Sequence, residues 1–106
     1  MRIATWNING VKARIDNLLT WLAETGPDVA CLQEIKTVNE GFPTDRLSEA
    51  GYRSAVHGQK GFNGVALLSR WPIEDVVPGL PGEPDPGQSR YIEALVSADT
   101  GICRVG

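Results

Sequence analysis

The sequence predicts an α/β fold whose sheet is mixed, with both parallel and antiparallel strands. Residues 2–34 show a strand–helix–strand pattern, which is typical of two parallel strands joined by a covering helix. Residues 52–57 and 65–69 are strand-like segments on either side of a glycine-rich stretch, which indicates an antiparallel hairpin. Residues 90–97 alternate apolar and other side chains, as a half-buried strand does.

The best-defined segment is residues 27–36, PDVACLQEIK. Its apolar run without alternation predicts a strand that is covered on both faces. Residues 2–6, RIATW, predict a second strand. Residues 10–26 between them place apolar side chains on one helical stripe: Val11, Ile15, Leu18, Leu19 and Leu22. We expect Asn9 to cap the start of this helix and Gly26 to end it.

The second half of the chain predicts mostly strands and loops. Residues 43–51 predict a short surface helix, and residues 72–77 predict one more strand. Residues 78–87 contain four prolines and three glycines and predict a loop. After a turn signal at residues 99–101, residues 102–105 begin a returning strand. Because a domain does not normally finish inside a core strand, we expect the chain to be the N-terminal part of a longer protein.

Composition indicates a soluble globular chain, in which 106 residues suffice for one domain and 42% are hydrophobic. The sequence has no signal-like segment and no apolar run of membrane-spanning length, which predicts a cytoplasmic location. The net charge of −3 argues mildly against a nucleic-acid partner, although a metal-dependent nuclease needs only one positive face. Cys31 and Cys103 lack metal-ligand spacing, so we expect two buried free thiols.

Two oxygen-bearing side chains are expected at one edge of the sheet. Asn7 directly follows the first strand, and Glu34 lies where the strand of residues 27–36 changes from apolar to polar. If these strands are parallel, both side chains lie at the carboxyl ends, where open α/β sheets place their sites. Amide and carboxylate oxygens suit Mg²⁺, so both residues are candidate ligands. A plainer interpretation stays open, in which Glu34 reaches solvent and Asn7 is a turn residue before the helix.

Cationic residues lie near the same edge. Lys36 is two residues beyond Glu34, which in an extended segment places it on the same side. Lys12 and Arg14 are expected in the first turn of the helix, where free N–H groups attract phosphate. An ordinary solvated surface is the alternative for each of these cations. His57 is the only histidine, and we expect it to be a strand-end residue rather than a catalytic one.

Four segments in register resemble the exonuclease III family of apurinic/apyrimidinic endonucleases. They are TWNINGVKAR, CLQEIK, HGQKGFNGVALLSR and the QSR that precedes Tyr91. The family belongs to the endonuclease/exonuclease/phosphatase superfamily, and the resemblance implies its four-layer α/β sandwich. Residues 1–106 would then be the N-terminal portion of one such domain. They would hold less than half of the sandwich, mostly one sheet with its covering helix.

The resemblance also implies roles for individual residues. Glu34 would bind Mg²⁺, with Mn²⁺ as an alternative, Asn7 would support the same site, and Lys36 would contact these ligands. DNA contacts are implied for five residues: Lys12, Ala13, Gly61, Phe62 and Arg90. From the residues alone, Phe62 could equally pack into the core, and the loop before Arg90 could be a plain surface insertion.

The function implied by the resemblance is a Mg²⁺-dependent DNA repair nuclease. It would be a monomer when full-length, and it would hydrolyse duplex DNA 5′ to abasic sites and remove 3′-terminal nucleotides. The family's catalytic tyrosine, Gly-Asp-x-Asn motif and Asp-His pair are absent from this sequence, so we expect the chain alone to be inactive. Two alternatives stay open: a related phosphoesterase acting on RNA, phosphoinositides or lipids, and a non-catalytic fragment that binds DNA or a partner.

Overall fold

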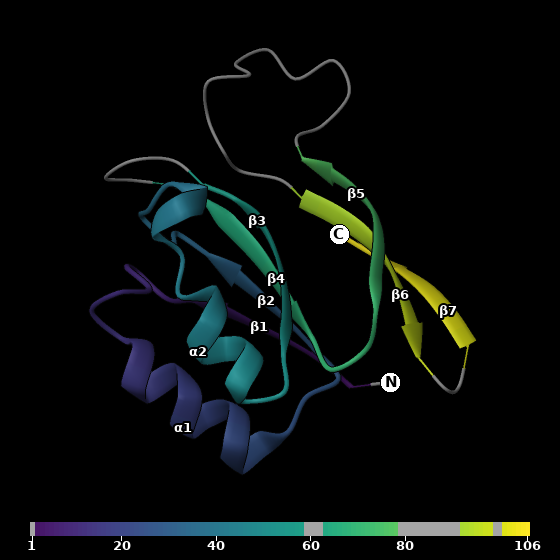
Figure 1. The fold of residues 1–106 in the computed structure, drawn as a ribbon, viewed down its shortest axis with the longest axis horizontal. Helices are drawn as coiled ribbons and strands as arrows, with labels where there is room; N and C mark the ends of the chain where they lie inside the picture. The colour runs from purple at the N-terminus through teal and green to yellow at the C-terminus, as the bar shows by residue number, and fades with distance from the viewer. Residues whose placement is uncertain (1, 59–62, 79–91, 99–100) are drawn as a thin grey trace.

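The structure is a computed structural model that describes residues 2–58, 63–78, 92–98 and 101–106. The elements follow in the order β1 (Ile3–Asn7), α1 (Ile15–Thr25), β2 (Val29–Gln33), the 3-10 helix η1 (Asn39–Gly41), α2 (Thr44–Glu49), β3 (Arg53–His57), β4 (Val65–Ser69), β5 (Ile73–Pro78), β6 (Ile92–Ala98) and β7 (Gly101–Val105). Figure 1 shows both α-helices on one side of β1 to β4 and the strands β5 to β7 on the other.

The described strands form two sheets. One is four-stranded, in the order β1-β2-β4-β3, and the other is three-stranded, in the order β5-β6-β7. The first sheet is mixed as predicted, because β1 and β2 are parallel whereas β4 is antiparallel to both β2 and β3. The expectation of mostly one sheet is wrong, since β5, β6 and β7 make a second sheet of their own.

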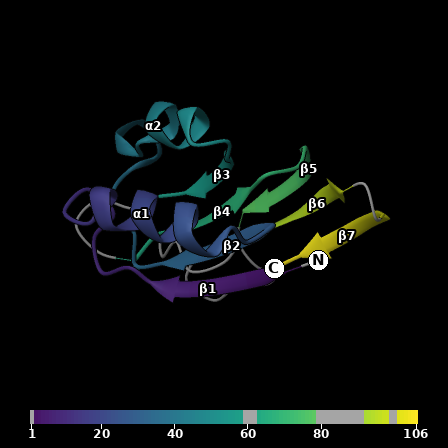
Figure 2. The same cartoon turned by 90° about the horizontal axis from the view of Figure 1, so that it is seen from below.

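The four-stranded sheet is covered on both faces, as the continuous apolar runs predict. On one face, Leu32 and Leu68 pack with the helix residues Leu18 and Leu47 in one core cluster. On the other face, strand residues pack against the second sheet in another cluster: Val29, Ala55, Val65 and Leu67 with Ile92, Ala94, Val96 and Val105. Figure 2 shows the resulting order of helices, four-stranded sheet and three-stranded sheet. Burying both faces of one sheet supplies most of the apolar burial that stabilises this fold.

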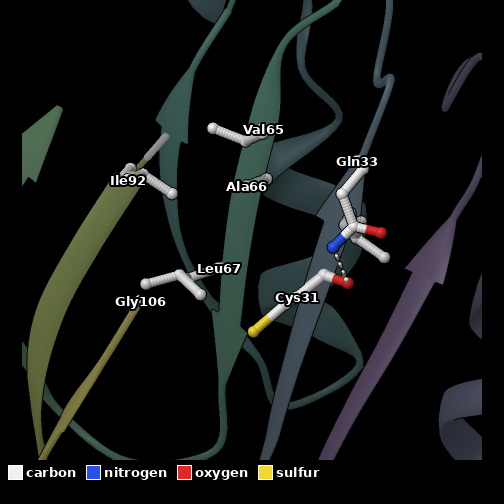
Figure 3. Close-up of a pocket in the computed structure, with 8 residues that line it drawn as sticks. Cys31, Gln33, Val65, Ala66, Leu67, Ile92 and Gly106 are labelled. Carbon is white, nitrogen blue, oxygen red and sulfur yellow. Dashed lines mark hydrogen bonds between the residues drawn. The ribbon is translucent and has the colours of Figure 1, made fainter. Parts of the chain in front are cut away.

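A cavity of about 100 Å³ lies between the two sheets, beside β2, β4 and β6. Figure 3 shows the side chain of Cys31 projecting from β2 toward this space. Cys31 and Cys103 are free, as predicted, but both are half-buried rather than buried. The packing around Cys31 still raises the pKa of its thiol above the usual range, because the thiolate would lose hydration there.

The first helix begins later than the sequence predicts. Asn9 is not its N-cap, since α1 starts at Ile15 and Arg14 occupies the cap position. The reason is that the backbone N–H groups of Gly10 and Val11 donate to carbonyls of the segment after β2, so this stretch extends the strand pairing instead of the helix. The predicted end is confirmed: Gly26 caps α1 in the left-handed conformation. Among the described residues, no helix is long and apolar enough to cross a membrane.

Candidate metal centre

Three chain segments run side by side beyond the carboxyl ends of β1 and β2. The segment after β2 lies in the middle, and its backbone is bonded on both sides. On one side, Ile8, Gly10 and Val11 donate N–H groups to the carbonyls of Gln33, Glu34 and Ile35 over 2.8–3.0 Å. On the other side, Ile35 and Lys36 donate to the carbonyls of Gly64 and Asn63 over 3.2 and 3.0 Å. Glu34 is therefore carried on backbone that is fixed from two directions.

The backbone at this edge adopts unusual conformations. Five described non-glycine residues have a positive φ, and four of them lie in these three segments: Asn9, Glu34, Lys36 and Asn63. Only Asp75 lies elsewhere, in β5. A left-handed conformation costs an L-residue roughly 1–2 kcal/mol, and it persists where surrounding contacts enforce it. Such residues concentrate at functional sites, so their clustering here supports a site at this edge.

The structure brings Asn7 and Glu34 to the same edge of the four-stranded sheet. Asn7 is the last residue of β1 and pairs with Gln33, the last residue of β2, and Glu34 follows immediately. Asn7 is exposed and Glu34 is half-buried, so water and a ligand can reach both side chains. Their amide and carboxylate oxygens fit the hard-ligand chemistry of Mg²⁺. The metal role of the two residues remains a prediction.

The described residues supply only part of a coordination sphere. No group of three or more His, Cys, Asp or Glu side chains gathers anywhere in the described ranges. That is compatible with Mg²⁺, which commonly takes one or two carboxylates and fills its other positions with water and substrate phosphate oxygens.

Lys36 reaches a residue that the sequence analysis did not assign to the site. Its Nζ donates to Oδ1 of Asn9, and Arg14 donates from Nη1 to the Asn9 carbonyl over 2.6 Å. Glu34 and Lys36 do not lie in an extended segment as predicted, because both have a positive φ. The Asn-Gly pair at residues 9–10 is the signal that could have indicated Asn9, since Asn and Gly tolerate the left-handed region best.

The candidate DNA-contacting residues fall into two groups. Lys12 and Ala13 are described and exposed, but they lie in a turn before α1 rather than in its first helical turn. Lys12 and Ala13 therefore do not belong to the helix N-terminus whose free N–H groups were expected to attract phosphate. The remaining candidates, Gly61, Phe62 and Arg90, lie outside the described residues. His57 is the last residue of β3, paired with Val65, as predicted for a strand-end residue.

This arrangement is that of an α/β sandwich with polar residues gathered at the carboxyl ends of neighbouring parallel strands. Residues 4–102 match the sequence model of the endonuclease/exonuclease/phosphatase family, and the chain belongs to that family. This family is of the metal-dependent nuclease type.

The chain is similar to proteins named as DNA nucleases. It is 37% identical to exodeoxyribonuclease III of Haemophilus influenzae over 105 residues, which are 99% of this chain and 39% of that protein. The structure of a 3'-5' exonuclease, NExo, from Neisseria meningitidis is 42% identical with a TM-score of 0.87, covering 92% of this chain and 38% of that one. Another structure of NExo, described as a 3' phosphatase, is bound to product DNA hairpin.

A further match extends the comparison to a protein from Archaeoglobus fulgidus. The structure of an AP endonuclease from Archaeoglobus fulgidus is 37% identical, with a TM-score of 0.86, and the match covers 92% of this chain and 37% of that one. In each of these comparisons, this chain spans less than two fifths of its relative's length. The similarity therefore concerns one part of the relatives' domain. Asn7 and Glu34 of this chain both lie within residues 4–102, which match the family model.

Proposed function

We propose that this chain is the metal-binding part of a Mg²⁺-dependent DNA repair nuclease of the exodeoxyribonuclease III type. Such a nuclease hydrolyses phosphodiesters 5′ to abasic sites and removes 3′-terminal nucleotides. The observation that carries the proposal is the meeting of Asn7 and Glu34 at one sheet edge, on neighbouring parallel strands, in a member of this family. The names of the relatives from Haemophilus, Neisseria and Archaeoglobus support the substrate class.

In this proposal the Glu34 carboxylate binds the cation and the Asn7 amide oxygen supports it, with Mn²⁺ as a possible substitute. A bound Mg²⁺ supplies positive charge that offsets the negative charge developing on a phosphodiester under attack. Glu34 suits this role because its backbone is bonded to Gly10 on one side and its neighbour Ile35 to Gly64 on the other. Fixed ligands of this kind lose little free energy to reorganisation during reaction.

The cations near the edge are proposed to meet the DNA backbone. Lys12 and Lys36 are both exposed, and they lie on two segments whose backbones are bonded to each other next to Glu34. Charge–charge contacts with phosphate position DNA without reading its sequence. The water-activating base is proposed to lie in the part of the relatives' domain that this chain does not span, so the chain alone is proposed to be inactive.

The proposal can be tested with a chimera. This chain replaces the matched 39% of Haemophilus influenzae exodeoxyribonuclease III, which then supplies the remainder of the domain. We expect the chimera to nick duplex DNA containing an abasic site when Mg²⁺ is present, and to be inactive with EDTA. Glu34→Gln removes the charge but keeps the shape, and should lower the rate by a factor of about 100 or more because a direct ligand is lost.

The matched control is Glu24→Gln, which makes the same chemical change on the exposed surface of α1. It should leave the rate unchanged. A folded chimera that cleaves RNA, phosphoinositides or lipids instead of abasic DNA would favour another phosphoesterase of the same superfamily. A folded chimera without hydrolytic activity on any of these substrates would favour a non-catalytic, DNA-binding or partner-binding role.

A further inference from the structure

The residue after β3 makes a close backbone contact with the segment that follows Glu34. The N–H of Gly58 donates a 2.6 Å hydrogen bond to Oδ1 of Asn39. A Cβ atom at Gly58 would lie 2.4 Å from the carbonyl oxygen of Thr37. It would also lie 2.7 Å from the carbonyl carbon of Val38 and from the backbone nitrogen of Asn39. All three contacts are shorter than side-chain carbons tolerate, so any other residue at position 58 must displace this backbone.

The neighbouring atoms have little room to move. They belong to the main chain rather than to the end of a flexible side chain. Thr37 is 4% exposed, so its backbone lies within the packed structure. The glycine is thus required for close approach of two backbone segments and not for a left-handed conformation. Asn39 adds a directional bond to this steric fit.

The contact lies on the same segment as the candidate ligand. The backbone of residues 34–36 is hydrogen-bonded to Gly10 and Val11 on one side and to Asn63 and Gly64 on the other. Residues 37–39 then meet Gly58. Gly58 and Asn63 flank the same loop between β3 and β4. Both residues are hydrogen-bonded to residues 34–39, which we call the Glu34 segment.

We propose that Gly58 and Asn39 are positioning residues that hold the Glu34 segment in place for metal binding. This inference rests on the proposed metal-dependent function, and it adds two residues that the sequence analysis did not identify. Neither residue is proposed to touch the metal or the DNA. They act by fixing the backbone that follows Glu34 and Lys36, whose left-handed conformations require support from their surroundings.

Amide hydrogen exchange on the 106-residue chain tests the contact without any metal or activity. Asn39→Ala removes the acceptor and should speed exchange at the Gly58 amide and at the amides of Ile35 and Lys36, by about tenfold for one lost hydrogen bond. Asn39→Asp keeps an acceptor oxygen and should restore protection. Asn17→Ala, an exposed asparagine on α1, is the matched control. Unchanged exchange at Ile35 and Lys36 in Asn39→Ala would overturn the proposal.

The chimera tests the consequence for metal binding. Gly58→Ala and Asn39→Ala should each raise the Mg²⁺ concentration needed for half-maximal rate by about tenfold, the usual effect of losing a group that supports a metal ligand. Asn39→Asp should behave like the unmodified chimera. Gly51→Ala introduces backbone strain, since Gly51 has a φ of 92°, but meets no atom within 4 Å. It should lower thermal stability without changing the Mg²⁺ requirement.

The outcomes separate this inference from the proposed function. An active chimera whose Mg²⁺ requirement is unchanged in both Gly58→Ala and Asn39→Ala would overturn the positioning role alone. A folded but inactive unmodified chimera would contradict the nuclease proposal, and with it the metal-related part of this inference. If Gly58→Ala does not fold, Asn39→Ala still decides the question, because it removes the bond without adding an atom.

Discussion

The N–H of Gly10 donates a 2.8 Å hydrogen bond to the carbonyl oxygen of Glu34, although both residues lie beyond the strands that carry them. The pairing of β1 and β2 therefore continues past the sheet edge. It does so while Glu34 has a φ of 53°, which turns its side chain away from the regular strand alternation. The bond from Gly10 thus holds Glu34 in a continuation of the pairing that places Asn7 beside Gln33.

Glu34→Gly is expected to separate stability from metal binding. Glycine enters the left-handed region without the strain of roughly 1–2 kcal/mol that other residues bear, although it loses about 0.5–1 kcal/mol more conformational entropy on folding. We therefore expect the free energy of unfolding to stay equal or rise by up to about 1 kcal/mol. Urea denaturation of the chain measures the free energy of unfolding. The chimera that carries Glu34→Gly should lose Mg²⁺-dependent cleavage.

The companion variant is Glu34→Ala, which removes the carboxylate but keeps the Cβ and its strain. It should be less stable than Glu34→Gly by about 1 kcal/mol. A Glu34→Gly variant less stable than Glu34→Ala would show that the left-handed conformation of Glu34 carries no strain, and would remove one of the arguments for a site at this edge.

The fold was predictable where the signal is local. Continuous apolar runs identified β2 and β4, and the strand–helix–strand pattern identified β1 as the parallel neighbour of β2. The start of α1 was not predictable, because apolar residues such as Val11 keep helical spacing in a segment whose N–H groups bond to Glu34 and Ile35 instead. Periodicity reports which side chains are buried and does not report distant hydrogen bonds.

The candidate site was predictable only in part. Asn7 and Glu34 could be placed together because parallel pairing fixes which strand ends meet. Asn39 and Gly58 could not be identified, since they are 19 residues apart and no local pattern indicates that their backbones touch. Local patterns likewise predicted strands at residues 72–77, 90–97 and 102–105 without indicating that β5, β6 and β7 form a separate sheet.

Tyr52→Phe is expected to destabilise the chain by about 1–2 kcal/mol. The Tyr52 hydroxyl donates a 2.7 Å hydrogen bond to the carbonyl oxygen of Pro27, and both residues are buried. Removing the hydroxyl leaves a buried carbonyl without this donor, which costs more than an exposed bond would. Thermal or urea unfolding measures the loss.

Tyr52→Leu serves as the comparison, because it removes the ring as well as the hydroxyl. It should cost more than Tyr52→Phe, since the lost ring contacts add to the lost hydrogen bond. Equal stability of the wild type and Tyr52→Phe would mean that the hydrogen bond from Tyr52, just before β3, to Pro27, just before β2, contributes nothing measurable to the free energy of unfolding.

Asp28 is expected to make stability depend on acid pH. Its carboxylate accepts the backbone N–H of Arg2 at 2.7 Å and the indole N–H of Trp71 at 3.0 Å. The bond from Arg2 is the main reason that the pKa of Asp28 lies below its usual value, and the bond from Trp71 adds to the effect. A carboxyl whose folded pKa is lowered stabilises the fold above its unfolded pKa, and this contribution is lost as pH falls through the folded value.

The measurement compares the wild type with Asp28→Asn by urea denaturation at a series of pH values. The wild type should be the more stable protein near neutral pH, and the difference should shrink below the ordinary aspartate pKa of about 4. Asp45→Asn, at an exposed position in α2, controls for removing a charge. A stability difference for Asp28→Asn that stays constant between neutral and strongly acid pH would contradict the assignment.

Cys31 is expected to react slowly with thiol reagents at neutral pH. Its side chain projects toward the cavity between the sheets, and burial raises its pKa above the usual thiol range. Because the thiolate is the reactive species, the reaction rate should rise steeply only at alkaline pH. Mass spectrometry after timed iodoacetamide treatment of a Cys103→Ser variant isolates the Cys31 signal. Unfolding in urea should abolish the protection, and fast labelling of the folded variant at neutral pH would show that the space beside Cys31 is open to solvent.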